Sequence, residues 1–144
     1  FKIAKNVYTG EDIPPDTDDV INNDKLFRYQ AKVLKELAKK ESFVVIGRCA
    51  DFILKDYPNL IRVFIYAPFK DCVNSEADRS SLKLSEIEKY IKAVDKRRAE
   101  YYHYYTGKVW NDARNYDLCL NSSAIGKETC VTLIEKYMEL KGCK

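Results

Sequence analysis

Short apolar runs alternate with helix-length amphipathic stretches along most of this chain, and this alternation constrains the fold more than any other feature. We expect strands at Phe43–Ile46, Ile61–Tyr66 and Tyr116–Leu120, where β-branched and aromatic residues gather. The longer stretches beside them carry apolar residues at helical spacing. Strands that alternate with helices favour βαβ units and a parallel sheet, so the expected fold class is α/β.

Helices are expected around these strands, and two further segments lack a clear pattern. The helices should span about 24–40, 49–56, 84–105 and 126–140. Residues 1–23 are expected to form a mobile acidic segment, because carboxylates follow Gly10 without a lysine or arginine among them. The polar stretch of about 70–84 is expected to be a mobile excursion. We expect one domain over residues 1–144, since this length suits a single core.

Composition and charge exclude several classes of protein. The net charge of +3 is too small to predict nucleic-acid binding, and no apolar run approaches the roughly 20 residues that cross a membrane. Five scattered cysteines without a C-x-x-C pair argue against a metal site and against a disulfide framework. We therefore expect a reducing, cytoplasmic compartment and no metal ligands. The single histidine, His103, has no assigned role.

Gly47-Arg48 follows the first expected strand and is the first candidate site. Ligands of open parallel sheets bind beyond the carboxyl ends of the strands, where a glycine allows a sharp turn. An arginine at this place presents a rigid donor fork that suits a phosphate or a carboxylate. The alternative is an arginine that pairs with Asp51 or lies in solvent. Position alone does not separate these two interpretations.

Arg98 is the second candidate, because it interrupts an apolar pattern. Apolar residues follow a three-four spacing along the 84–105 helix, and Arg98 occupies one of their places. Asp95 lies three residues earlier on nearly the same face. One interpretation is a self-contained ion pair at the edge of the core, and the other is a pair that lines a cleft for an anionic ligand. Both remain open from the spacing.

The same helix mixes basic residues with tyrosines, which is a pattern that can bind single-stranded nucleic acid by charge and stacking. We favour a simpler interpretation, in which tyrosines pack on one face and basic residues are solvated on the other. Nucleic acid is therefore not expected as a partner. The five glycines are far apart in the sequence, and no G-x-x-x-x-G-K-[ST] phosphate loop occurs in the 144 residues.

Several spaced motifs together resemble one known family. They are Val44-Val45-Ile46-Gly47-Arg48, Arg62-Val63-Phe64-Ile65-Tyr66-Ala67, Val94-Asp95-Lys96-Arg97-Arg98, Tyr104-Tyr105-Thr106-Gly107-Lys108-Val109-Trp110 and Asn115-Tyr116-Asp117-Leu118-Cys119-Leu120-Asn121. In this order they strongly resemble the cytidylate kinase-like family of P-loop nucleoside monophosphate kinases. The resemblance covers roughly residues 26–140.

The resemblance implies a fold, a reaction and site residues. The fold would be a three-layer α/β/α arrangement of the P-loop NTPase type, without its first strand and phosphate loop. The reaction would transfer the ATP γ-phosphoryl group, with Mg²⁺, to CMP or a similar nucleoside monophosphate. The expected substrate-binding residues are Arg48, Asp51, Asp95 and Arg98, and Arg98 is also the expected catalytic residue. The resemblance assigns no residue of this chain to the ATP phosphates or to a metal.

The sequence also departs from the family pattern. Ile91 and Lys92 stand where true cytidylate kinases carry an additional R-D before the D-x-x-R element, and Arg79 is the only arginine in the lid-like segment of about 70–84. The chain opens on Phe1, which we interpret as a hint of further residues upstream. The main alternative to a kinase is therefore a non-catalytic nucleotide-binding or regulatory domain. A single-stranded nucleic-acid-binding module ranks third.

Overall fold

A computed structural model describes residues 19–143, and the chain divides into two compact units. Unit 1 ends at Tyr57 and unit 2 begins at Pro58. The expected mobile segment at residues 1–23 lies mostly outside the described residues, although Asp19 to Asn23 already belong to a helix. The single domain expected over residues 1–144 stays a prediction.

Unit 1 is built on the long helix α1 (Asp19–Ala38), which confirms the helix expected over about 24–40. The short helix α2 (Ala50–Ile53) packs against α1, but it is shorter than the expected 49–56. The core of this unit consists of four buried residues at and beside α2: Cys49, Ala50, Ile53 and Leu54. The hydroxyl of Tyr57 donates a hydrogen bond to the Lys35 carbonyl (3.1 Å) and ties the end of the unit to α1.

The strand expected at Phe43–Ile46 is wrong for the part of the chain that the structure describes. These residues pair with no other strand among residues 19–143. The side chains of Val44 and Ile46 are 83% and 85% exposed, whereas Phe43 and Val45 are half-buried. The alternation typical of a strand is thus present in the burial pattern. A strand needs a hydrogen-bonded neighbour as well, because its backbone groups must be paired.

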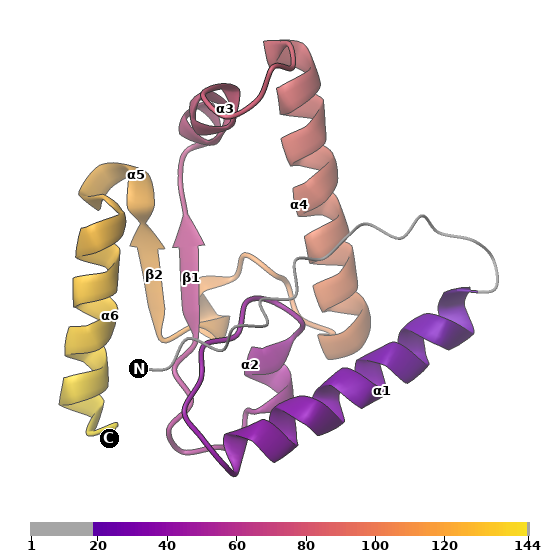
Figure 1. The fold of residues 1–144 in the computed structure, drawn as a ribbon, viewed down its shortest axis with the longest axis vertical. Helices are drawn as coiled ribbons and strands as arrows, with labels where there is room; N and C mark the ends of the chain where they lie inside the picture. Colours follow the sequence, from indigo (N-terminus) through magenta and orange to yellow (C-terminus); the bar gives the residue numbers. More distant parts are fainter. Residues whose placement is uncertain (1–18, 144) are drawn as a thin grey trace. The chain divides into compact units, whose positions relative to one another are not determined.

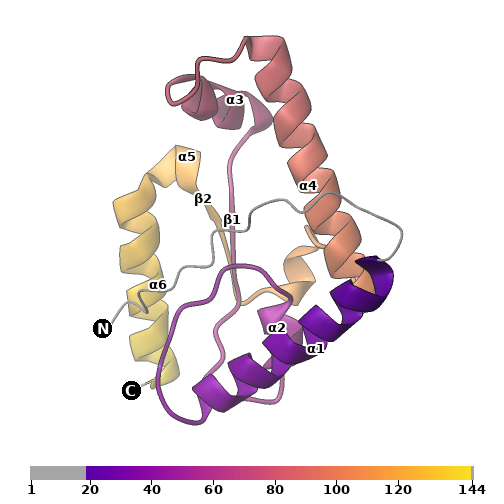
Figure 2. The same ribbon diagram turned by 45° about the vertical axis from the view of Figure 1, so that its right-hand side comes forward.

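Unit 2 holds a two-stranded parallel sheet of β1 (Val63–Tyr66) and β2 (Leu118–Asn121), in which Val63 pairs with Leu118 and Tyr66 with Asn121. Its helices are α3 (Phe69–Ala77), α4 (Leu84–Thr106), the 3₁₀ turn η1 (Ala113–Asn115), α5 (Ser122–Ile125) and α6 (Lys127–Lys141). In both ribbon views the strands lie between α6 and α4 (Figures 1 and 2). The parallel arrangement confirms the α/β class, and the three-layer P-loop NTPase arrangement stays a prediction.

The element ends in unit 2 follow local chemistry. The α4 helix ends at Gly107, whose φ of +68° is easily adopted by glycine, and the Gly107 amide donates to the His103 carbonyl (2.8 Å). The side chain of Asn121 accepts hydrogen bonds from the Ser123 and Ala124 amides and caps the start of α5. These ends place the carboxyl edge of the strands beside the start of α5.

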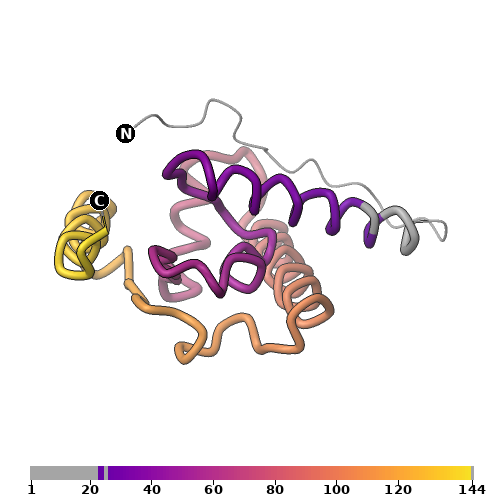
Figure 3. The backbone as a smooth tube through the Cα atoms, turned by 90° about the horizontal axis from the view of Figure 1, so that it is seen from below, coloured from indigo at the N-terminus to yellow at the C-terminus, as the bar shows by residue number. Residues whose placement is uncertain are grey.

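The connector between α4 and β2, residues 107–117, is packed onto β1 and can be followed in Figure 3. The Phe64 ring stacks on Tyr116 with 4.9 Å between centroids and meets the Trp110 ring edge-on at 5.5 Å. Buried Asn115 donates from Nδ2 to the Val109 carbonyl (2.8 Å), and the Tyr116 hydroxyl donates to the Trp110 carbonyl (2.5 Å). The connector therefore attaches the end of α4 to the sheet.

Across residues 19–143, every helix falls short of the length and apolar character that a membrane crossing requires.

Candidate functional site

The turn at Gly47, Arg48 and Cys49 is the most unusual stretch of backbone in unit 1. All three residues have positive φ values, of 68°, 58° and 54°. Glycine adopts this region freely, but a residue with a Cβ atom loses about 1–2 kcal/mol there. The cost at Arg48 and Cys49 is offset by packing, because Cys49 and Ala50 are buried at 3% and 5% exposure. Strain of this kind concentrates at binding and catalytic sites, which makes the turn a functional candidate.

The charges beside this turn also affect the Cys49 thiol. Burial and the nearby Asp51 carboxylate raise the pKa of Cys49 to about 12, and Arg48 opposes them only partly. Arg48 and Asp51 are both half-buried, and neither is without an interaction partner. Gly47-Arg48 and Asp51 thus lie together in unit 1, as the sequence predicts. Their role in binding a substrate stays a prediction.

In unit 2, Asp95 and Arg98 form an ion pair on α4. Arg98 Nη1 donates to Asp95 Oδ1 at 2.9 Å. The helix rotates about 100° per residue, so Arg98 lies within about 20° of the direction of Ile87, which is fully buried. By helical periodicity, Arg98 therefore lies on the same side of α4 as the buried Ile87. Its side chain is nevertheless 60% exposed, so no element of unit 2 covers this part of the face.

Because Arg98 is exposed, it avoids the free-energy cost of burying a charge, which its place in the apolar pattern would predict. A charge on a covered helix face would be expensive, whereas an exposed i,i+3 pair contributes only a few tenths of a kcal/mol. The Asp95 side chain is 48% exposed and remains accessible as well. An arginine that is held by a carboxylate and open to solvent can bind an anion through its remaining N–H groups. The pair is therefore chemically suited to a phosphate, and this role stays a prediction.

The lid-like stretch of about 70–84 is partly helical. It contains most of α3, which packs on α4, and Lys92 of α4 lies over the Phe69 ring at 5.1 Å from its centroid. Arg79 follows α3 and is exposed. The Ser123 hydroxyl donates to the Asp71 carboxylate, which links the first turn of α3 to the start of α5. The segment is thus helical as far as Ala77, and its action as a lid stays a prediction.

Sequence reasoning missed the ion pair that joins the two strands at their amino ends. The Asp117 carboxylate accepts from the Arg62 amide (2.7 Å), from Nε (3.1 Å) and from Nη2 (2.8 Å). The Asp117 and Leu118 amides both donate to the Arg62 carbonyl (2.8 and 3.1 Å). The side-chain hydrogen bond from Arg62 lowers the pKa of Asp117. A charged residue directly before each strand was the only signal in the sequence.

The described residues show no fit to a metal ion, and the sequence shows none to the ATP phosphates. Among residues 19–143, no cluster of three or more His, Cys, Asp or Glu side chains could hold a metal. The 144 residues contain no glycine-rich phosphate loop.

Comparison with known proteins gives consistent results. Two curated cytidylate kinases from strains of Saccharolobus islandicus are 27% and 26% identical to this chain, over 85% and 83% of its length and 68% and 67% of theirs. The crystal structure of an uncharacterized protein from Eubacterium ventriosum superimposes with a TM-score of 0.67 at 31% identity and covers 96% of this chain and 78% of that one. The model of the cytidylate kinase-like family matches residues 2–124. This chain belongs to the cytidylate kinase-like family.

Proposed function

We propose that this chain contains the acceptor half of a nucleoside monophosphate kinase, which binds CMP or a similar nucleotide for phosphorylation by ATP. The observation that carries the proposal is the pair of arginines at the two family motifs. Arg48 is held in a left-handed turn, and Arg98 is paired with Asp95 at 2.9 Å. Kinases of this kind act mainly by positioning and by charge stabilisation, so oriented arginines are the groups that the reaction needs.

Each proposed residue has a separate task. Arg48 binds the phosphate of the acceptor through its guanidinium fork, from a turn whose backbone is strained. Asp51, three residues later, lies beside the same turn and is the other proposed substrate-binding residue of unit 1. On α4, Asp95 orients Arg98, whose remaining N–H groups can stabilise negative charge during transfer. Binding of the ATP phosphates calls for a glycine-rich loop, which the 144 residues do not contain.

A binding measurement tests the acceptor half directly. Calorimetric titration of the chain with CMP, dCMP and UMP should give saturable heats. Arg48→Ala and Arg98→Ala should each weaken binding by roughly 10- to 100-fold, because a hydrogen bond to a charged group contributes about 1.5–3 kcal/mol. Arg114→Ala is the matched control, since Arg114 is 89% exposed and pairs only with Asp112 within the described residues. A chain that binds none of the three nucleotides would refute the proposal.

A second candidate is a non-catalytic nucleotide-binding or regulatory domain, which the absence of a phosphate loop from the sequence favours. The two candidates differ in turnover and not in binding. ADP formation from ATP and CMP, measured on a form of the protein that carries a glycine-rich loop, separates them. Turnover supports the kinase. Binding of CMP without turnover by that form supports the regulatory domain.

A further inference from the structure

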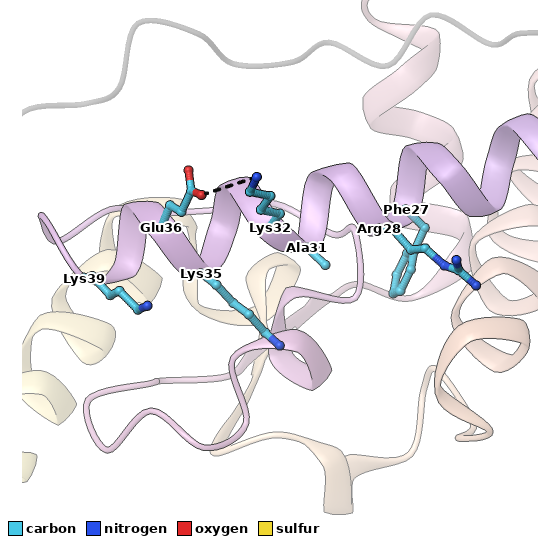
Figure 4. A pocket seen from close by; sticks show the side chains of 7 residues that line it. All are labelled: Phe27, Arg28, Ala31, Lys32, Lys35, Glu36 and Lys39. Carbon is cyan, nitrogen blue, oxygen red and sulfur yellow. Dashed lines mark ion pairs between the residues drawn. The ribbon is translucent and has the colours of Figure 1, made fainter.

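One side of α1 carries a row of cations that the proposed kinase site does not use. The row consists of Arg28, Lys32, Lys35 and Lys39, and we refer to it as the basic face. At about 100° and 1.5 Å per residue, the three positions within α1 fall within an arc of about 60° and a length of about 10 Å, and Lys39 follows directly after the helix. Figure 4 shows their side chains together with the others that line this hollow of the surface.

The basic face is poorly neutralised. Among the residues that line this hollow the one carboxylate is Glu36, whose Oε1 lies 4.0 Å from Lys32 Nζ in a pair exposed at 73% and 56%. Among the side chains that the structure describes, those of residues 23, 24 and 26–143, no ion pair is recorded at Arg28, Lys35 or Lys39. Four cations thus stand against one carboxylate among the residues that line this hollow, which gives this part of the surface a local positive charge.

The dipole of α1 explains only part of this arrangement. Cations stabilise the last turn of a helix, and Lys35 lies in the last turn of α1. This effect falls off within one turn, whereas Arg28 and Lys32 lie two to three turns from the end of the helix at Ala38. The dipole therefore does not explain the earlier cations, and a bound polyanion would meet all four.

Aromatic side chains lie beside the cations. Phe27 lines the same open hollow, which has a volume of about 420 Å³. Tyr29 on the same helix is 67% exposed, and its direction lies about 60° from that of Lys32 around the helix axis. Cations that follow a backbone, next to a ring on which a base can stack, are the elements of single-stranded nucleic-acid binding. Duplex DNA would leave the ring without a base to stack on.

We propose that the basic face of α1 binds single-stranded nucleic acid, with phosphates at the four cations and a base on Tyr29. The inference rests on unit 1 alone and does not depend on the kinase proposal. The proposal differs from the sequence-based expectation. That expectation concerned the basic residues of the 84–105 helix, and the net charge of the whole chain was too small to predict nucleic-acid binding. A small net charge does not exclude binding when the excess lies on one surface.

Fluorescence anisotropy of the full chain with labelled 20-nucleotide oligouridylate and oligothymidylate tests the inference. Four phosphate contacts predict a salt slope of about −2.8, so affinity should fall about 50-fold between 50 and 200 mM salt. Replacing Arg28, Lys32, Lys35 and Lys39 by glutamine should abolish this salt-dependent binding. Tyr29→Ala should weaken it roughly tenfold with little change in the salt slope. A preference between the two oligomers would show whether RNA or DNA is the ligand.

The matched control removes the same charge elsewhere. Lys89, Lys96, Lys127 and Lys136 are all exposed on α4 and α6, and their replacement by glutamine leaves the same net charge as the first variant. Circular dichroism should show that both quadruple variants are folded. The inference is overturned if neither oligomer binds at 50 mM salt, or if both variants lose affinity equally. It is also overturned if duplex DNA or phosphatidylserine vesicles bind more tightly than the single strands.

Discussion

Replacing Asp117 by asparagine should destabilise unit 2, because this carboxylate holds the amino ends of both strands. It accepts three hydrogen bonds from Arg62, and its side chain is only 16% exposed. Asparagine has nearly the same shape and can still accept one of these bonds. It removes the negative charge and leaves the Arg62 guanidinium, 33% exposed, without its carboxylate.

The magnitude follows from the position of this pair between surface and interior. An exposed pair contributes about 0–1 kcal/mol, and breaking a fully buried one costs about 3–5 kcal/mol. Hydrogen bonds to charged groups contribute about 1.5–3 kcal/mol each, and the asparagine side chain can still accept one of the three bonds. We therefore expect Asp117→Asn to lower the free energy of unfolding by about 2 kcal/mol at pH 7.

Urea unfolding followed by tryptophan fluorescence is the assay. Trp110 is the only tryptophan, and its ring meets Phe64 of β1, so its signal reports on this unit. The control is Asp112→Asn, because Asp112 makes similar bonds to Arg114, whose side chain is 89% exposed compared with 33% for Arg62. This control should unfold at nearly the wild-type urea concentration.

The effect should also depend on pH in one direction. Hydrogen bonds from Arg62 lower the pKa of folded Asp117, whereas in the unfolded chain it lies near its usual value of about 3.9. The stabilisation is therefore complete above about pH 5 and is lost as the pH falls through the lowered value. The free energies of unfolding of wild type and Asp117→Asn should differ by a constant amount between pH 5 and 7 and should converge in more acidic solution. Equal stability at pH 7, or a gap that widens on acidification, would refute the reasoning.

Further predictions concern the turn and the cysteines. Gly47→Ala should lower thermal stability by about 1 kcal/mol through its φ of +68° alone, since nothing lies within 4 Å of an added Cβ, and Arg48→Gly should relieve the backbone strain at this position while it removes the interactions of the side chain. Equal melting temperatures for Gly47→Ala and the wild type would contradict this. The Cys49 thiol, with its pKa near 12 and 3% exposure, should resist iodoacetamide at pH 8 until the chain unfolds. Exposed Cys119 should react in the folded protein, and mass spectrometry of the labelled peptides distinguishes the two sites.

The sequence predicted elements well where local signals agree. The 84–105 helix has apolar spacing along its length and a glycine at its end, and α4 spans Leu84–Thr106. Ile61–Tyr66 and Tyr116–Leu120 contain β1 and most of β2. The run Phe43–Ile46 has an equally strong strand composition, yet it forms no ladder in the described residues. Composition records a preference for extended backbone, but a strand also depends on a neighbour elsewhere in the chain.

The sequence singles out the candidate residues, but it does not predict the geometry around them. Arg48 and Arg98 stand out in the sequence through a glycine and through a break in an apolar pattern. The left-handed turn at Arg48 and Cys49 was not predictable, because it depends on the burial of Cys49 and Ala50. The Arg62–Asp117 pair was missed because its partners are 55 residues apart and meet only when the strands align. Pairings of this kind depend on tertiary contacts and not on local spacing.

The most direct test of an acceptor site compares CMP with cytidine, which lacks the phosphate, in wild type and Arg48→Ala. If Arg48 binds the phosphate, wild type should prefer CMP over cytidine by roughly tenfold or more, as a charged hydrogen bond of about 1.5–3 kcal/mol requires. Arg48→Ala should lose most of this preference and leave the affinity for cytidine unchanged. Equal affinities for CMP and cytidine in the wild type, or an unchanged preference in Arg48→Ala, would contradict the account.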